Sequence, residues 1–261
     1  MTDLSYIRDA REALLRGIGT VESSGFEPDP FQKEAISSLC NFQDTLVVAP
    51  TGSGKTFIAF EAIDAFLRLK TRAVYTTPLK ALSNTKYSEL KARFEPEFKV
   101  GLLTGDRKIQ PDADVIVATT EIYRNELYSL NADYSLVVLD EVHFIADDQR
   151  GAVWEESIIL TPYESILLML SASISNPEEI SQWTQYVRQK PCKVIVETER
   201  PVELRYGFLH PEHGVIPLMD RKGRIFKEVE RFYGALPVLS HGTKKSFKLS
   251  RKRRKRRRKK R

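Results

Sequence analysis

An α/β fold, with a parallel sheet covered by helices on both faces, is the fold class that this 261-residue sequence predicts. Short apolar runs of strand length alternate along the chain with longer segments in which apolar residues recur at helical spacing. Such an order implies parallel strands joined by crossover helices. A glycine-bearing segment at 49–56 joins the first strand to a helix, and Asp140 and Glu141 end a later strand. Both therefore fall at the edge of the sheet where α/β proteins bind ligands.

The elements follow in order from the pattern. An amphipathic helix is expected at 3–16, and after Pro28 and Pro30 break the chain a second helix is expected at 31–39. Further helices are expected from Lys55 onward and at 81–93, 121–128, 153–160 and 177–187. Strands are expected at 44–49, 73–77, 99–103, 115–119, 136–140, 166–171 and 192–197.

Domain boundaries follow from where this pattern weakens. Beyond residue 200, prolines at 201, 211 and 217 and a glycine at 223 interrupt it. We therefore expect an N-terminal helical extension at 1–25, a compact domain at 26–200, a linker-like extension at 201–243 and a disordered basic tail at 244–261.

Composition indicates a soluble intracellular protein. Hydrophobic residues make up 41% of the chain, and the apolar stretches are far shorter than the roughly 18 residues that a membrane helix needs. The polar N-terminus is no signal peptide, so we expect a cytoplasmic protein, or a nuclear one if the chain is eukaryotic. Cys40 and Cys192 are too few for a disulfide framework or a zinc site, and both are predicted to be core thiols.

The net charge of +6 hides an acidic body and a basic tail. Residues 244–261 contain 14 Lys or Arg and no acid, whereas the remaining 27 basic and 35 acidic residues give a formal charge of −8. Such a tail repels itself and is attracted to nucleic-acid phosphates. A nuclear targeting signal, or a segment cut from a longer linker, explains it equally well.

The segment at 49–56 reads Ala-Pro-Thr-Gly-Ser-Gly-Lys-Thr, the composition of a phosphate-binding loop. Its backbone N–H groups would converge on phosphate oxygens at the positive end of the following helix. Lys55 would reach the β- and γ-phosphates, and Thr56 would place its hydroxyl on Mg²⁺. Ala49 stands where the usual pattern has glycine, and a small-residue tight turn is the alternative. The other predicted cofactor-binding residues of the loop are Thr51, Gly52, Ser53 and Gly54.

Two adjacent carboxylates complete a triphosphatase pattern. Asp140 can hold Mg²⁺ through water while Glu141 orients and deprotonates the attacking water. Alone, such a pair is more often a solvated strand end. Together with the phosphate loop, it predicts hydrolysis of a nucleoside triphosphate, with Mg²⁺ as cofactor and Lys55, Asp140 and Glu141 as catalytic residues.

Eight segments in order extend this pattern beyond the ATP site. They lie at 26–32, 49–56, 77–87, 101–106, 118–122, 140–143, 150–156 and 170–173. In this arrangement the chain resembles superfamily 2 DExH-box helicases, and among them the superkiller-type RNA helicases that work with the exosome. The resemblance implies the RecA-like fold of P-loop NTPases. The Lys-Ala-Leu-Ser-Asn run at 80–84 and the Trp-Glu-Glu segment at 154–156 favour RNA over DNA.

The resemblance also implies roles for further residues. Gln32 would read the adenine edge and Phe26 would stack on the ring, although Phe26 could instead be a domain-capping hydrophobe. His143, Ser171 and Ser173 would couple γ-phosphate loss to the nucleic-acid side, although His143 could equally be a core residue. The residues expected to hold the sugar-phosphate backbone are Thr77, Lys80, Thr104, Gly105, Thr119 and Thr120.

The expected function is that of an ATP-dependent RNA helicase represented by its N-terminal motor half. A second RecA-like domain, which would supply arginine fingers, is not recognisable after Pro201, so weak ATP hydrolysis is expected from this chain alone. A non-catalytic, ATP-responsive RNA-binding module is the alternative from another class. An unrelated P-loop enzyme such as a small kinase fits the order of motifs less well.

Overall fold

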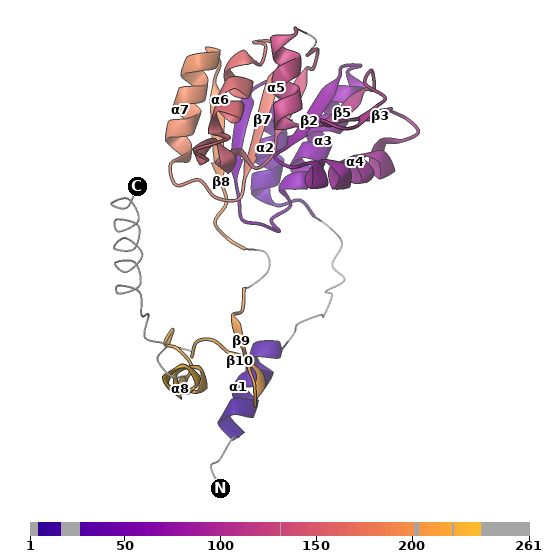
Figure 1. Cartoon of the computed structure of the whole chain (residues 1–261). Helices are drawn as coiled ribbons and strands as arrows, with labels where there is room; N and C mark the ends of the chain where they lie inside the picture. Colours follow the sequence, from indigo (N-terminus) through magenta and orange to yellow (C-terminus); the bar gives the residue numbers. More distant parts are fainter. Residues whose placement is uncertain (1–4, 17–26, 131, 201–203, 221, 236–261) are drawn as a thin grey trace, which may run out of the picture. The chain divides into compact units, whose positions relative to one another are not determined.

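The computed structural model describes residues 5–16, 27–130, 132–200, 204–220 and 222–235 (Figure 1). These residues form two compact units. The larger unit comprises residues 27–200, and the smaller one combines residues 5–16 with 204–220 and 222–235. Phe26 and the basic tail lie outside the described residues, so their predicted roles stay predictions.

A single sheet of eight strands forms the centre of the larger unit. The strands are β1 (Asp44–Val48), β2 (Ala73–Thr77), β3 (Val100–Leu103), β4 (Lys108–Ile109), β5 (Val115–Thr119), β6 (Leu136–Leu139), β7 (Ile166–Ser171) and β8 (Cys192–Val196). Their order across the sheet is β4-β3-β5-β2-β6-β7-β1-β8. All neighbours are parallel except β3 and β4, so the predicted parallel sheet is confirmed. The two-residue β4 is too short to give a sequence signal.

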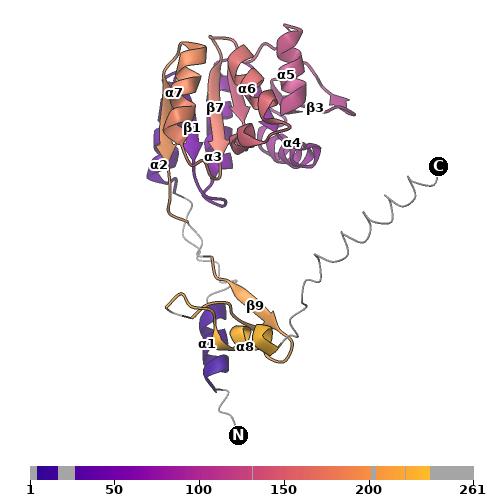
Figure 2. The same ribbon diagram turned by 60° about the vertical axis from the view of Figure 1, so that its left-hand side comes forward.

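Helices cover both faces of this sheet, as predicted (Figures 1 and 2). One face packs against α2 (Pro30–Cys40), α3 (Lys55–Arg68) and α4 (Lys80–Phe94) around one apolar cluster. The other face packs against α5 (Thr120–Tyr128), α6 (Gly151–Leu160) and α7 (Pro177–Arg188) around a second cluster. None of the described helices is both long and apolar enough to cross a membrane.

The two cysteines differ in their surroundings. Cys192 is buried, as expected, and burial raises the pKa of its thiol to about 12. Cys40 is exposed, so its prediction as a core thiol is wrong. The face of α2 that packs on the sheet carries Phe31, Ala35 and Leu39. Cys40 follows Leu39, and because each helical residue is rotated by about 100° from the one before, its side chain points away from the sheet.

A buried ion pair fixes β1 within the unit. The Arg188 guanidinium donates from Nε to Asp44 Oδ2 at 2.7 Å, and the two side chains are 1% and 0% exposed. The other Asp44 oxygen accepts the Leu167 backbone N–H at 2.9 Å. Arg188 also donates to the carbonyls of Thr161 and Ser165, at 2.7 and 2.8 Å. This network joins α7 to both β1 and β7.

The smaller unit contains α1 (Ser5–Leu15), the hairpin of β9 (Gly207–His210) and β10 (Gly214–Pro217), and α8 (Lys227–Ala235). Its core consists of Ile7, Ile216 and Val229, with three partly buried neighbours, Phe208, Leu218 and Phe226. The linker-like character expected after residue 200 therefore does not hold for 204–220 and 222–235. The two strands are only four residues long, Pro211 follows the first and Pro217 ends the second. A core partner, Ile7, lies far upstream in sequence, so the local pattern gave no sign of this unit.

Candidate functional site

The phosphate loop follows β1, which lies next to the edge strand β8, and runs directly into α3. All five residues of β1 are buried, and Gly52 and Gly54 have φ angles of +88° and +81°, in the left-handed region that favours glycine. Gly54 precedes the helix, and no side chain caps its first turn among the described residues. The first turn of α3 is therefore the candidate for the anion site that the sequence predicts. Thr51 and Gly52 are exposed, whereas the Ser53 hydroxyl is buried without a described hydrogen-bond partner.

Gln32 supports this loop from α2. Its side chain is buried, its Oε1 accepts the Asp29 backbone N–H at 2.9 Å, and its Nε2 donates to the Ser53 carbonyl at 2.9 Å. One N–H and one lone pair of the amide remain for another partner. The predicted contact of Gln32 with adenine therefore stays a prediction, and in this structure its amide braces the phosphate loop.

Alanine at Gly54 is expected to destabilise the larger unit by about 2–4 kcal/mol and to weaken nucleotide binding. The positive φ costs roughly 1–2 kcal/mol for an L side chain, and an added Cβ would collide with the Gln32 amide nitrogen. Gly52→Ala is the matched control, since it has the same backbone strain but nothing within 4 Å of the added Cβ. Urea unfolding measures both, and equal losses in the two variants would exclude a specific role for the Gln32 contact.

The side chain of Lys55 folds back onto the loop that precedes it. Its Nζ donates to the carbonyls of Ala49 and Pro50, at 2.6 and 3.0 Å. Burial lowers the pKa of Lys55, and the negative charges of Glu141 and Asp140 oppose that shift. The structure thus brings the predicted phosphate-binding lysine into the electrostatic field of the two predicted carboxylates.

Asp140 is held by a tyrosine that the sequence did not single out. The Tyr75 hydroxyl, on β2, donates to Asp140 Oδ2 at 2.7 Å, and the Glu141 backbone N–H donates to Oδ1 at 3.0 Å. Burial raises the pKa of Asp140, while these two hydrogen bonds favour its charged form. The sequence did offer a signal for this contact: Tyr75 lies in a fully buried strand, and a buried tyrosine hydroxyl needs a hydrogen-bond partner.

Glu141 turns the chain from β6 into the short helix η1 (Val142–Ala146) and has a left-handed φ of +56°. Burial raises the pKa of Glu141, and the neighbouring Asp140 carboxylate raises it further. His143 Nδ1 lies 3.3 Å from Glu141 Oε2. The His143 ring stacks on Phe144, with centroids 4.9 Å apart, and Phe144 stacks on Trp154 at 5.6 Å. His143 is therefore fixed beside the predicted base, and it is half-exposed rather than part of the core.

The other two predicted coupling residues border the phosphate loop. Ser171 ends β7 and is buried, and its carbonyl accepts the Ala49 backbone N–H at 3.0 Å. Its hydroxyl contacts the carbonyl and N–H of Ser173, at 3.2 and 3.3 Å. The serine segment is thus joined directly to the first residue of the loop.

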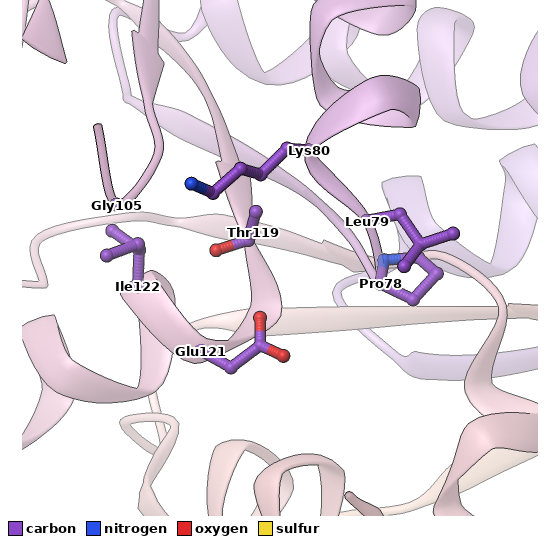
Figure 3. A pocket seen from close by; sticks show the side chains of 7 residues that line it. All are labelled: Pro78, Leu79, Lys80, Gly105, Thr119, Glu121 and Ile122. Carbon is purple, nitrogen blue, oxygen red and sulfur yellow. The ribbon is translucent and has the colours of Figure 1, made fainter. Parts of the chain in front are cut away.

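Three of the predicted nucleic-acid residues share a pocket of about 300 Å³ at the same edge of the sheet (Figure 3). Lys80 extends over Thr119 toward Gly105, and its Nζ pairs with Asp106 at 3.0 Å. The remaining lining residues are Pro78, Leu79, Glu121 and Ile122. A cation and a hydroxyl facing one hollow can hold a phosphodiester, so the structure makes these three the best placed of the six.

The other three predicted nucleic-acid residues use their hydroxyls inside the protein. Thr77 is within 3.1 Å of the Leu79 carbonyl and 2.7 Å of the Ser83 hydroxyl. Thr120 donates to the Thr77 carbonyl at 3.2 Å, and Thr104 donates to Asp106 at 2.9 Å. These threonines shape the loops around the pocket, and their backbone groups remain the candidates for contact.

Comparison with known proteins adds independent evidence. The family model for DEAD/DEAH box helicases matches residues 29–180. The human exosome RNA helicase MTR4 is 41% identical over 215 residues, covering 81% of this chain and 20% of that protein. The mRNA transport homolog 4 of Caenorhabditis elegans is 42% identical over 233 residues, covering 84% and 22%. The chain thus spans about a fifth of the length of these relatives.

Solved structures support the fold. A helicase MrfA structure with DNA aligns with a TM-score of 0.55 at 19% identity, covering 76% of this chain and 30% of that one. A hypothetical ATP-dependent RNA helicase from Sulfolobus tokodaii aligns with a TM-score of 0.54 at 20% identity, covering 72% and 57%. The matched family region contains the phosphate loop, both carboxylates and the pocket beside Lys80, and the relatives confirm the resemblance to superkiller-type RNA helicases. The chain belongs to the DEAD/DEAH box helicase family.

Proposed function

We propose that this chain is the ATP-binding half of an ATP-dependent RNA helicase. The observation that carries the proposal is the grouping of Lys55, Thr56, Asp140 and Glu141 at one edge of the sheet, the edge that also forms the Lys80 pocket. The grouping pairs a phosphate-binding loop with a buried acid and a base of raised pKa. An ATPase and a backbone-binding pocket on one sheet edge are what a helicase motor needs.

The residues present fit Mg²⁺. The Thr56 hydroxyl and the Asp140 carboxylate are hard oxygen donors, and Asp140 is already oriented by Tyr75. No group of three His, Cys, Asp or Glu able to hold a metal occurs within the described ranges, so nucleotide phosphates and water would complete the shell. Bound there, Mg²⁺ would neutralise charge that develops on the transferred phosphoryl group.

Hydrolysis would then use the chain's own groups in distinct ways. Glu141 would accept a proton from the water that attacks the γ-phosphorus while the bond to the β–γ bridging oxygen breaks. Lys55 would leave the loop carbonyls to pair with the phosphates. In the described part of the chain, the positive groups that act on Asp140 and Glu141 are Lys55, Lys86 and His143, with no arginine among them. A second RecA-like domain would therefore supply the arginine finger, worth about 10³–10⁵ in turnover.

RNA is the polymer that we propose for the Lys80 pocket, with DNA less favoured. Support comes from several relatives that are named RNA helicases and from the 80–84 and 154–156 segments. Contacts through a lysine, a hydroxyl and backbone groups would position a strand without selecting its sequence.

The proposal is tested with Lys55→Ala and with Lys33→Ala, an exposed lysine of α2, as the matched control. Losing the phosphate-binding ammonium should weaken ATP binding by at least about tenfold and abolish any RNA-stimulated turnover, because a charge-assisted hydrogen bond contributes about 1.5–3 kcal/mol. Equilibrium binding and phosphate release, with and without single-stranded RNA, measure both effects.

A second RecA-like domain of the family, added in trans, should raise turnover of the unaltered chain. ATP binding that depends on Lys55 without turnover under any of these conditions would favour a non-catalytic, ATP-responsive RNA-binding module. Binding that survives Lys55→Ala would argue against a nucleotide role for this loop.

A further inference from the structure

Lys86 reaches the candidate ATP site from α4, although nothing in the sequence pattern assigned it a role. Its Nζ donates to the Thr56 hydroxyl at 3.2 Å and to Glu89 Oε2 at 2.7 Å. The Lys86 side chain is only 16% exposed, unlike the neighbouring Lys91, which is 49% exposed and pairs with Glu95. A lysine that buries most of its stem to reach one hydroxyl occupies a defined place in the site.

The charges around Lys86 are mixed but mainly negative. Its positive charge acts on both Asp140 and Glu141, as does that of Lys55. Glu89 lies one turn further along α4. Lys86 thus contacts one hydroxyl and one carboxylate directly, and its charge acts on two further carboxylates.

The position of this ammonium conflicts with that expected for Mg²⁺. Thr56 is the hydroxyl expected to coordinate the metal, and it is the hydroxyl that Lys86 now contacts. Two cations beside one oxygen repel each other, and Mg²⁺ demands near-ideal octahedral geometry. Glu89 already holds the other side of the ammonium and offers it a place away from Thr56.

We propose that Lys86 is a resident counter-cation of the nucleotide site, a positioning residue that holds the Thr56 hydroxyl and balances Asp140 and Glu141 before metal arrives. On loading of nucleotide with Mg²⁺, the ammonium withdraws from Thr56 and stays paired with Glu89. When nucleotide binds without Mg²⁺, the ammonium remains at Thr56 and supplies part of the positive charge that the metal would supply. This role rests on the proposed ATP-binding function.

Removing the charge should therefore increase the dependence of nucleotide binding on metal. The measurement is the dissociation constant of fluorescently labelled ADP for the full chain, with excess Mg²⁺ and with EDTA. In Lys86→Met the ratio of the EDTA value to the Mg²⁺ value should rise by about tenfold, since metal-free nucleotide loses a cation and Mg²⁺ loses a competitor. Lys86→Arg should keep the ratio near that of the unaltered chain, and Lys91→Met is the matched control on the same helix.

Glu89→Gln supplies a second test of opposite sign. Without its second partner, the ammonium is held more firmly at Thr56, so the same ratio should fall by about threefold. Glu89 is a partly exposed side chain on the helix surface, so this variant tests the role even if Lys86→Met does not fold. A thermal unfolding measurement shows whether the Lys86→Met variant is folded.

The outcomes separate the two proposals. A ratio unchanged in a folded Lys86→Met variant, or a rise in Glu89→Gln, would overturn the counter-cation role and leave ATP binding intact. Labelled ADP that binds the unaltered chain no better than Lys55→Ala would instead overturn the proposed nucleotide site, and the role of Lys86 with it.

Discussion

Replacing Glu141 by glutamine is expected to lower ATP turnover by about 10²–10⁴-fold while nucleotide affinity stays near that of the unaltered chain. The amide has the shape of the carboxylate but cannot accept the proton of the attacking water. Phosphate release at saturating ATP and single-stranded RNA, with a second RecA-like domain added, measures turnover. Binding of labelled ADP measures affinity in the same samples.

Glu178→Gln is the matched control, because Glu178 is an exposed glutamate on α7 and should leave turnover unchanged. The pH profile gives an additional readout. Burial and Asp140 raise the pKa of Glu141, so turnover that needs its charged form should decline with falling pH sooner than an ordinary glutamate predicts. Turnover within about tenfold of normal in Glu141→Gln would assign the base elsewhere, since general-base catalysis contributes more.

Arg188→Met is expected to lower the free energy of unfolding of the larger unit by about 3–5 kcal/mol. The substitution leaves the buried Asp44 carboxylate with only the more distant Lys190 ammonium, 4.0 Å away, as counter-charge, and it removes the donors that serve the carbonyls of Thr161 and Ser165. Both tryptophans of the chain, Trp154 and Trp183, belong to the larger unit, so tryptophan fluorescence during urea unfolding reports on that unit.

Two further variants test whether the buried charge causes this expected loss of stability. Arg68→Met breaks an exposed ion pair with Asp64 and should cost no more than about 1 kcal/mol. Combining Arg188→Met with Asp44→Leu should recover part of the loss, because it removes the unpaired buried charge, although the Leu167 N–H loses its acceptor. A loss near that of Arg68→Met would show that the Asp44 charge finds water or another partner.

The fold of the larger unit could be predicted from sequence because its signals are local. Each strand of the sheet except β4 is an apolar run, and each crossover helix carries apolar residues at helical spacing. The smaller unit could not be predicted in this way. Its stability depends on Ile7 meeting Ile216 and Val229, a contact between chain segments that no local pattern connects.

The chemistry of the site could be predicted more fully than its contacts. The phosphate loop and the pair Asp140 and Glu141 follow from residue type and order, but the direction of a side chain does not. Thr77 and Thr120 present hydroxyls that a sequence offers to a ligand, yet the structure turns them toward neighbouring protein groups. For Lys86 the opposite holds: its residue type suggested no role, but the packing of α4 brings its ammonium to Thr56 in the candidate ATP site.

The place of β1 in the sheet has a consequence for biosynthesis. Both of its neighbours, β7 and β8, come late in the chain, and β8 ends at Val196. A ribosome therefore releases the phosphate-loop strand long before it releases the strands that pair with it. Until then, β1 exposes two unsatisfied edges and an apolar surface, the features that attract chaperones and promote aggregation. The proposed nucleotide-binding loop, although encoded early, follows a strand that is among the last to acquire its native neighbours.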